Sequence, residues 1–260
     1  MPGDVTPVGL ALSLVLVAVA VVLSRWQRLG LQRRMVWASA RAIAQLLLVG
    51  AALGLVIDPR APLAWSWLWI AGMTLFAGDV VRRRIRELPG VLPLAVAAFA
   101  ASAAVTLGTL FGLGIFPMEP RTVVPLGGMM IGNSMNATVV AARRILEELR
   151  DKRSEVEVRL ALGQPSREAA RPYLAAALRT ALIPQIETTR AVGLVFLPGA
   201  MTGLILAGVE PMDAVLVQAV VMFLVLGAAA TTTSVIGLGL TRRFFTHDHR
   251  LVTMARPAQL

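Results

Sequence analysis

Residues 143–208 read RRILEELRDKRSEVEVRLALGQPSREAARPYLAAALRTALIPQIETTRAVGLVFLPGAMTGLILAG. The first part of this stretch is rich in arginine and glutamate, and it runs without a break into a mostly apolar second part, residues 181–208. Elsewhere the chain alternates long apolar runs with shorter linkers. A long polar insert in such a chain is where a membrane protein meets a partner in water. We therefore expect residues 143–182 to form a cytosolic insert.

The composition is typical of an integral membrane protein. Of the 260 residues, 57% are hydrophobic, and the mean hydropathy of +0.72 is too high for a soluble domain of this size. The net charge of +10 does not indicate a nucleic-acid partner, because the basic residues cluster between the apolar runs. The chain has no cysteine, which excludes disulfides, thiolate metal sites and cysteine nucleophiles.

The apolar runs predict an all-α membrane protein, a polytopic bundle of about seven transmembrane helices. The expected spans cover about residues 6–24, 42–57, 63–81, 91–116, 123–142, 183–208 and 213–240. Apart from Arg60 and Arg121, every arginine and the single lysine follow odd-numbered spans, which places the N-terminus outside and the C-terminus in the cytosol. We expect residues 1–260 to form one transmembrane domain. Its first span is expected to be a retained anchor, because no basic residue precedes it.

The insert has the pattern of a helix, a tight turn and a second helix. Residues 147–162 have helical composition, and Gly163 lies where a C-terminal cap is expected. Pro165 cannot continue the first helix, and Ser166 suits the N-cap of the next one. This pattern predicts a hairpin whose turn projects into the cytosol, where the groove of a partner could grip it.

Five parts of the sequence carry a resemblance to a known family. They are RAIAQLLLVG (41–50), PLGGMMIGNSMNA (125–137), LALGQPSREA (160–169), ALIPQIETTRAVGLVFLPGAMTGLILAG (181–208) and Gln218. They resemble the permease subunits of ATP-binding-cassette transporters, and in particular the FetB-type permease family that is linked to iron export. The resemblance implies a homodimer of seven-span permease domains in the inner membrane, with ATP and Mg bound by a separate, FetA-like ATPase chain.

The resemblance assigns ATPase docking to the turn of the insert. The spacing from Glu157 to Gly163 also resembles a signature that docks classical importers on their ATPase. The alternative is an ordinary helical hairpin that covers the bundle. The residues expected to dock are Glu157, Leu160, Ala161, Leu162, Gly163, Gln164, Pro165 and Ser166.

The sequence independently argues against ATP hydrolysis by this chain. A P-loop requires Gly-Lys-Ser/Thr, so that the lysine reaches the β- and γ-phosphates. The single lysine, Lys152, lies between Asp151 and Arg153 and belongs to no such motif. We expect a subunit that is not itself an enzyme and binds no cofactor, with hydrolysis on another polypeptide.

Three polar residues inside an apolar run, Asn133, Ser134 and Asn136, are candidates for the translocation pathway. Polar groups are costly in lipid, so we expect this face to point into the bundle or into a pore. The alternative is that these residues form hydrogen bonds that hold neighbouring helices together. The sequence argues against a serine hydrolase, because no histidine lies in the apolar runs to activate Ser134.

Two carboxylates near the inner ends of spans, Glu187 and Asp79, are further pathway candidates. Hard cations prefer oxygen ligands, so these groups could gather a cation at the inner mouth, with Arg190 beside Glu187. The alternative is local pairing, of Glu187 with Arg190 and of Asp79 with a following arginine. No ligand cluster with recognisable spacing is present, and a resident metal site is not predicted.

The sequence Leu197-Pro198-Gly199 interrupts the sixth apolar run, and Gly203 follows one turn later. Proline removes a helix hydrogen bond, so we expect a kink or break here that could act as a hinge. A kink that only improves packing is the alternative. The two histidines, His247 and His249, are expected to lie in a solvated tail.

Together these features predict a permease subunit that exports a metal cation, iron by resemblance, with ATP hydrolysed by a partner chain. A secondary transporter driven by an ion gradient is the alternative. Such transporters usually use carboxylates buried in the membrane, whereas this chain keeps its acidic residues near the edges of the spans.

Overall fold

The computed structural model describes residues 7–56, 62–85, 90–246 and 250–251. In these ranges the chain forms α-helices and two isolated β-bridges, which confirms the prediction of an all-helical protein. The Cα positions divide the chain into two units, Met1–Ala61 and Pro62–Leu260. A single permease domain over the whole chain stays a prediction. The two histidines of the tail lie outside the described residues.

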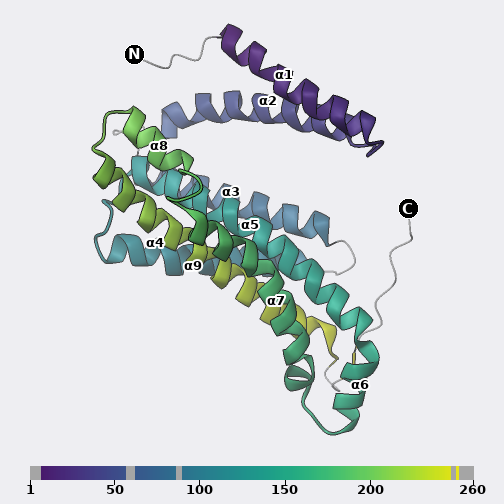
Figure 1. The fold of residues 1–260 in the computed structure, drawn as a ribbon. Coiled ribbons are helices and arrows are strands. Elements are labelled where there is room, and N and C mark those ends of the chain that lie inside the picture. Colours follow the sequence, from purple (N-terminus) through teal and green to yellow (C-terminus); the bar gives the residue numbers. More distant parts are fainter. Residues whose placement is uncertain (1–6, 57–61, 86–89, 247–249, 252–260) are drawn as a thin grey trace. The chain divides into compact units, whose positions relative to one another are not determined.

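The first unit is a hairpin of two apolar helices, α1 (Pro7–Trp26) and α2 (Gln32–Val56), which pack against each other (Figure 1). Nearly all of their described residues are exposed or half-exposed, as expected for helices whose outer surface faces lipid. The helix α2 begins at Gln32, soon after α1 ends at Trp26. Its start is earlier than that of the expected second span, which was placed at residue 42. The residues around Arg33 and Trp37 therefore belong to the helix and not to a linker.

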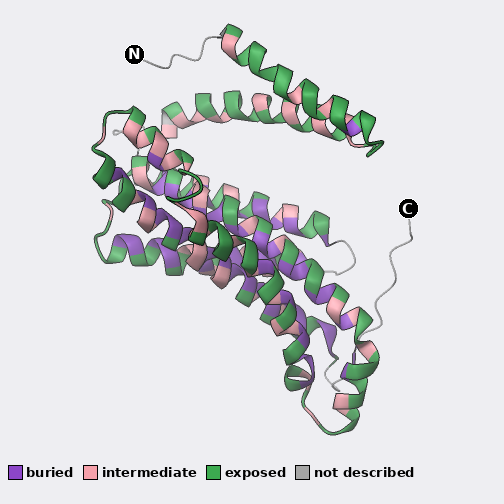
Figure 2. Cartoon of the chain, in the orientation of Figure 1, coloured by how far each residue is buried: buried purple, intermediate pink, exposed green. Residues whose placement is uncertain are grey.

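The second unit contains the remaining described helices, with α5 and α9 at its centre (Figure 1). The long helix α5 packs against α3, α7 and α9, while α9 also packs against α4 and α8. The buried core runs along these contacts, as the purple faces in Figure 2 show. The helices are α3 (Leu63–Arg84), α4 (Val91–Gly112), α5 (Pro120–Asp151), α6 (Arg153–Ala161), α7 (Ser166–Ala191), α8 (Gly199–Leu206) and α9 (Pro211–Phe244).

Glycines allow the central helices to approach closely. A Cβ atom added at Gly127 of α5 would lie 2.8 Å from Ile70 Cδ1 of α3. At Gly239 of α9 it would lie 2.2 Å from Leu94 Cδ1 of α4. Small residues at such crossings are typical of membrane helices, where van der Waals contact between backbones replaces the hydrophobic effect.

Five of the described helices are long and apolar enough to cross a membrane, which confirms a multi-pass membrane protein in coarse form. The five do not include the expected fifth span, which lies on α5, or the expected sixth span, which is divided between α7 and α8. A count of seven spans and their orientation stay predictions. The five helices are Val8–Trp26, Gln32–Gly54, Leu63–Arg84, Val91–Gly112 and Pro211–Phe244.

The expected interruption of the sixth apolar run is present, and it begins earlier than the sequence indicated. The helix α7 ends at Ala191, and the chain becomes helical again only at Gly199, directly after Pro198. Gly193 adopts a positive φ of 85°, and its N–H donates to the carbonyl of Phe196 at 3.1 Å. The left-handed glycine therefore turns the chain before the proline is reached.

The insert also differs in detail from the expected helix over residues 147–162. The central helix α5 continues as far as Asp151, and a break at Lys152 separates it from the short helix α6. One rigid helix therefore extends from the middle of the bundle into the polar insert. The second expected helix is present, but Pro165 occupies the N-cap position that was assigned to Ser166.

Candidate functional site

The turn between α6 and α7 has a well-defined backbone geometry. Gly163 has a φ of 85°, a left-handed conformation that favours glycine. Its N–H donates to the carbonyl of Leu160 at 2.9 Å, and the N–H of Gln164 donates to the carbonyl of Arg159 at 3.1 Å. These two bonds form a Schellman motif, which satisfies carbonyls at the end of α6 and fixes the direction in which the chain leaves it.

The tip of this turn is exposed. Leu162 has 77% of its surface accessible, and a Cβ added at Gly163 would meet no heavy atom within 4 Å in the described chain. An exposed leucine on a rigid turn, at the far end of the unit in Figure 1, is suited to a hydrophobic pocket on another protein. This arrangement supports docking, although docking itself stays a prediction.

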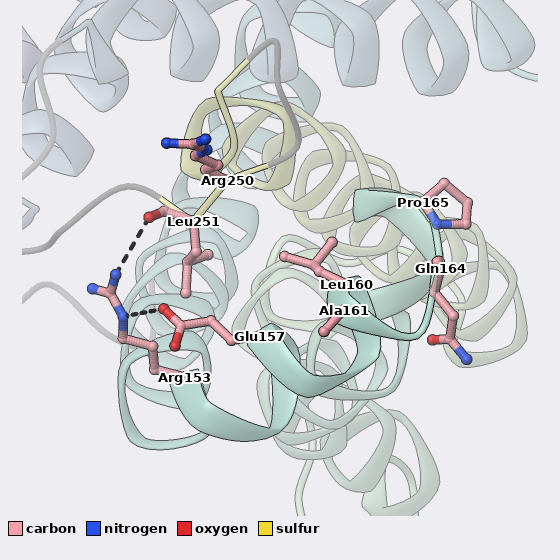
Figure 3. Close-up of a pocket in the computed structure, with 9 residues that line it drawn as sticks. Arg153, Glu157, Leu160, Ala161, Gln164, Pro165, Arg250 and Leu251 are labelled. Carbon is pink, nitrogen blue, oxygen red and sulfur yellow. Dashed lines mark hydrogen bonds and ion pairs between the residues drawn. The ribbon is translucent and has the colours of Figure 1, made fainter.

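Behind the tip lies a cavity of about 710 Å³, which the C-terminal segment closes on one side (Figure 3). The structure thus brings most of the predicted docking residues together around one hollow, while Leu162 and Ser166 lie outside its lining. The lining residues are Arg153, Glu157, Leu160, Ala161, Gly163, Gln164, Pro165, Arg250 and Leu251.

The C-terminal segment after α9 packs onto the insert, a contact that the sequence did not predict. Leu251 is only 7% exposed, and it pairs with Phe245 in an isolated antiparallel bridge. Arg153 donates to the Leu251 carbonyl at 3.5 Å and to Glu157 Oε1 at 2.7 Å. The segment therefore links the end of α9 to α6. The only feature of the sequence that could have indicated this contact was the presence of apolar side chains in a tail that was expected to be solvated.

A polar cluster joins α6 to α7, and the sequence reasoning also missed it. The hydroxyl of Tyr173 donates to Glu155 Oε2 at 2.9 Å, and Lys152 Nζ donates to Glu155 Oε1 at 2.8 Å. The guanidinium of Arg159 lies 5.9 Å from the centre of the Tyr173 ring. One feature of the sequence could have indicated this cluster. Tyr173 is the single tyrosine of the chain, and it lies inside an alanine-rich helix.

These contacts shift the ionisation of both charged partners. The hydrogen bond from Lys152, followed by that from Tyr173, lowers the pKa of the Glu155 carboxyl below its ordinary value. The hydrogen bond to Glu155 and its charge raise the pKa of Lys152. Both groups are therefore ionised near neutral pH, and the cluster is a charged link between the two helices of the insert.

The three polar residues of α5 divide between two faces of the helix. Asn133 and Asn136 are exposed on one face, where Asn133 Nδ2 donates to the Met129 carbonyl at 2.8 Å. Ser134 is fully buried, and its hydroxyl donates to the Met130 carbonyl at 2.6 Å. The asparagine face does not point into the packed helices of its own unit, α3 to α9. A place for these amides in a translocation pathway stays a prediction.

Several buried hydroxyls of the bundle form hydrogen bonds within the described chain. Buried hydroxyls such as those of Thr138, Thr233 and Thr241 donate to carbonyls one turn earlier on their own helices, at 2.7 to 2.8 Å. Ser102 bonds across to the Ala228 carbonyl at 3.3 Å. Gln218 Oε1 is buried without a hydrogen-bond partner in the described chain. The bonded hydroxyls are thus satisfied inside the protein.

The remaining pathway candidates, Glu187, Arg190 and Asp79, form local ion pairs. Such pairs were the alternative to a role in the pathway. Arg190 Nη1 lies 2.9 Å from Glu187 Oε1, and both side chains are exposed. Asp79 bonds to Arg82 at 2.5 Å and to Arg83 at 2.6 Å. The described residues contain no group of three or more histidine or acidic side chains that could hold a metal ion.

Known proteins similar to this chain were found by sequence. A profile described as "Uncharacterised protein family (UPF0014)" matches residues 7–245. The rice protein "UPF0014 membrane protein STAR2" is 39% identical over 84% of this chain and 76% of its own length. "Protein ALUMINUM SENSITIVE 3" of Arabidopsis thaliana is 33% identical over 97% of this chain and 91% of its own length. The "Probable iron export permease protein FetB" of Escherichia coli is 30% identical over 96% of each chain. No solved structure matches.

Proposed function

Since this chain belongs to the UPF0014 family of membrane proteins, we propose that it is the permease subunit of an ATP-binding-cassette transporter. The proposed activity is export of a metal cation across the inner membrane, with ATP and Mg bound by a separate ATPase chain. Iron is the proposed substrate, because a relative over nearly the whole chain is named as an iron export permease. The several apolar helices agree with a permease role.

The observation that carries the proposal is the rigid, exposed turn around Gly163 and the way it is fastened to the bundle. The two capping bonds fix the turn, and the Glu155–Tyr173 contact joins α6 to α7. From the turn, α7 extends for 26 residues without a break. At 1.5 Å per residue this is about 39 Å of continuous helix. A partner that displaces the turn would therefore move the far end of α7.

The far end of α7 is the place where such a movement can change the membrane part of the fold. There the helix stops at Ala191, and an irregular segment precedes α8. Interrupted helices accommodate movement more easily than continuous ones, and they often mark substrate sites in transporters. The proposed hinge consists of Pro198, Gly199 and Gly203 together with Gly193. ATP binding by the partner would shift the subunit between inward-open and outward-open states at this hinge.

The proposed pathway lies between two copies of the chain. The amides of Asn133 and Asn136 are exposed on α5 and would be costly against lipid. A second copy that places the same face opposite would shield them and would line a path with amide oxygens, ligands that suit hard cations. Glu187 and Asp79 would attract cations at the cytosolic mouth of this path, once their arginine partners move away.

The proposal is tested by capturing the partner. Co-expression with a FetA-type ATPase chain should give a complex that survives purification through the permease. Leu162→Glu places a charge at the exposed tip and should reduce the captured ATPase at least tenfold. Leu113→Glu, an equally exposed leucine at the end of α4, is the control and should leave capture unchanged. Equal capture by both variants would contradict docking at this turn.

A further inference from the structure

A second hollow lies between the start of α7 and the end of α9, and it shares Ser166 with the predicted docking residues. It has a volume of about 600 Å³. Three arginines from the two helices line it, together with one acidic residue, so positive charge prevails. The lining residues are Ser166, Arg167, Glu168, Arg171, Leu174, Leu238, Thr241 and Arg242.

The three arginines of this cleft could each interact with a bound anion. Within the described part of the chain, no ion pair joins Arg167, Arg171 or Arg242 to an acidic side chain. The neighbouring Arg243 is directed elsewhere, since its guanidinium packs over Gly90 before α4. Three unpaired guanidinium groups around one hollow repel one another, and an anion between them would relieve this repulsion.

Apolar and basic groups follow opposite chain orders on the two helices. Along α7, Arg167 and Arg171 come first, and Leu174 follows on the side toward the apolar end of the helix. Along α9, Leu238 comes first, and Arg242 follows at the polar end. Both helices therefore place a leucine toward the membrane and arginines toward the cytosol. A phospholipid has the same polarity, with its acyl chains beside the leucines and its phosphate beside the guanidinium groups.

We propose that this cleft binds the phosphate headgroup of an anionic phospholipid from the cytosolic leaflet. Its leucine walls suit acyl chains beside a charged headgroup, and so favour a lipid. A basic pocket between membrane helices on the cytosolic side is a recurrent way to bind such headgroups. The site is independent of the transported substrate. A lipid bound here would hold the start of α7 against the end of α9.

The test uses the purified full-length protein in detergent, with binding followed by native mass spectrometry. Dioleoylphosphatidylglycerol should bind, and zwitterionic dioleoylphosphatidylcholine should bind at least tenfold more weakly. Arg171→Gln and Arg242→Gln should each weaken phosphatidylglycerol binding roughly fivefold, and the double variant roughly 25-fold. Arg171→Lys keeps the charge and should lose less. Arg84→Gln removes an exposed arginine at the end of α3, outside the cleft, and should change binding less than twofold.

Several results would overturn the inference. Equal binding of the two lipids would show that the headgroup charge is not recognised. An effect of Arg84→Gln as large as that of Arg171→Gln would show a general charge effect. Displacement of the lipid by inorganic phosphate at equal concentration would assign the cleft to a free anion. Unchanged lipid binding with reduced capture of an ATPase chain would assign the arginines to the partner protein.

Discussion

The hydroxyl of Tyr173 on α7 donates a 2.9 Å hydrogen bond to Glu155 on α6, and this bond joins the two helices on either side of the exposed turn. The Tyr173 ring is buried, whereas the carboxylate lies at the surface and is also held by Lys152. In the proposed mechanism, a partner that displaces α6 would therefore also move α7, through a side chain that is buried in the core.

Tyr173→Phe removes the hydroxyl and keeps the packed ring. The bond to Glu155 is lost, so α6 should open more often, with roughly two- to tenfold faster hydrogen exchange of its amides. Hydrogen exchange followed by mass spectrometry measures this. Glu147→Gln, which removes an ion pair within α5, is the control and should leave α6 unchanged. Equal exchange of α6 in wild type and Tyr173→Phe would show that the bond does not restrain the helix.

The link between α6 and α7 should depend on pH in the acid range. Because the pKa of Glu155 is lowered in the folded protein, its contribution is complete above the ordinary glutamate pKa. It is lost as the pH falls through the lowered value. Spin labels at Ser154→Cys and Ala176→Cys should then report a broader distance distribution, and the chain contains no other cysteine to interfere. Glu155→Gln should give the broad distribution at every pH. A transition that persists in this variant would assign it to another group.

Gly163→Val should separate ATP hydrolysis from transport. A branched side chain at a φ of 85° is strained by roughly 1–2 kcal/mol, so the turn should leave its capped conformation while the spans stay folded. We expect transport per ATP hydrolysed to fall at least tenfold in a reconstituted complex. Gly114→Val meets a similar strain at a φ of 68° in the loop after α4, and it should retain coupling. Loss of coupling in both variants would indicate a general defect.

Asn133→Cys and Asn136→Cys should cross-link two copies of the chain. The proposed interface places the asparagine faces opposite each other near a two-fold axis, so a short bismaleimide should give a covalent dimer. Val105→Cys on α4 has a similarly exposed position and serves as the control. A dimer yield for the α5 variants that is no higher than that for the α4 variant would contradict the proposed pathway.

Patterns of neighbouring residues correctly predicted features that depend on those residues alone. The apolar runs predicted helices, the Gly163–Pro165 pattern predicted the turn, and Pro198 predicted an interruption of the sixth run. The interruption began earlier because Gly193 takes a left-handed conformation that its neighbours alone do not require.

Contacts between residues that are distant in the chain could not be predicted from the sequence. Arg153 and the Leu251 carbonyl are 98 residues apart, and Tyr173 and Glu155 are 18 apart on different helices. No periodicity in the chain encodes such pairs. Ser134 and Asn136 are close in sequence, yet they lie on different faces of α5, one buried and one exposed. Which face is covered depends on how α5 packs against α3, α7 and α9.

The most direct test of the proposal is metal flux in sealed vesicles that contain the purified permease with or without a FetA-type ATPase chain. We predict ATP-dependent movement of ferrous iron only when both chains are present, with loss of flux in Gly163→Val and retention in Gly114→Val. Flux by the permease alone, driven by a proton or sodium gradient, would contradict an ATP-driven permease and would establish a secondary transporter.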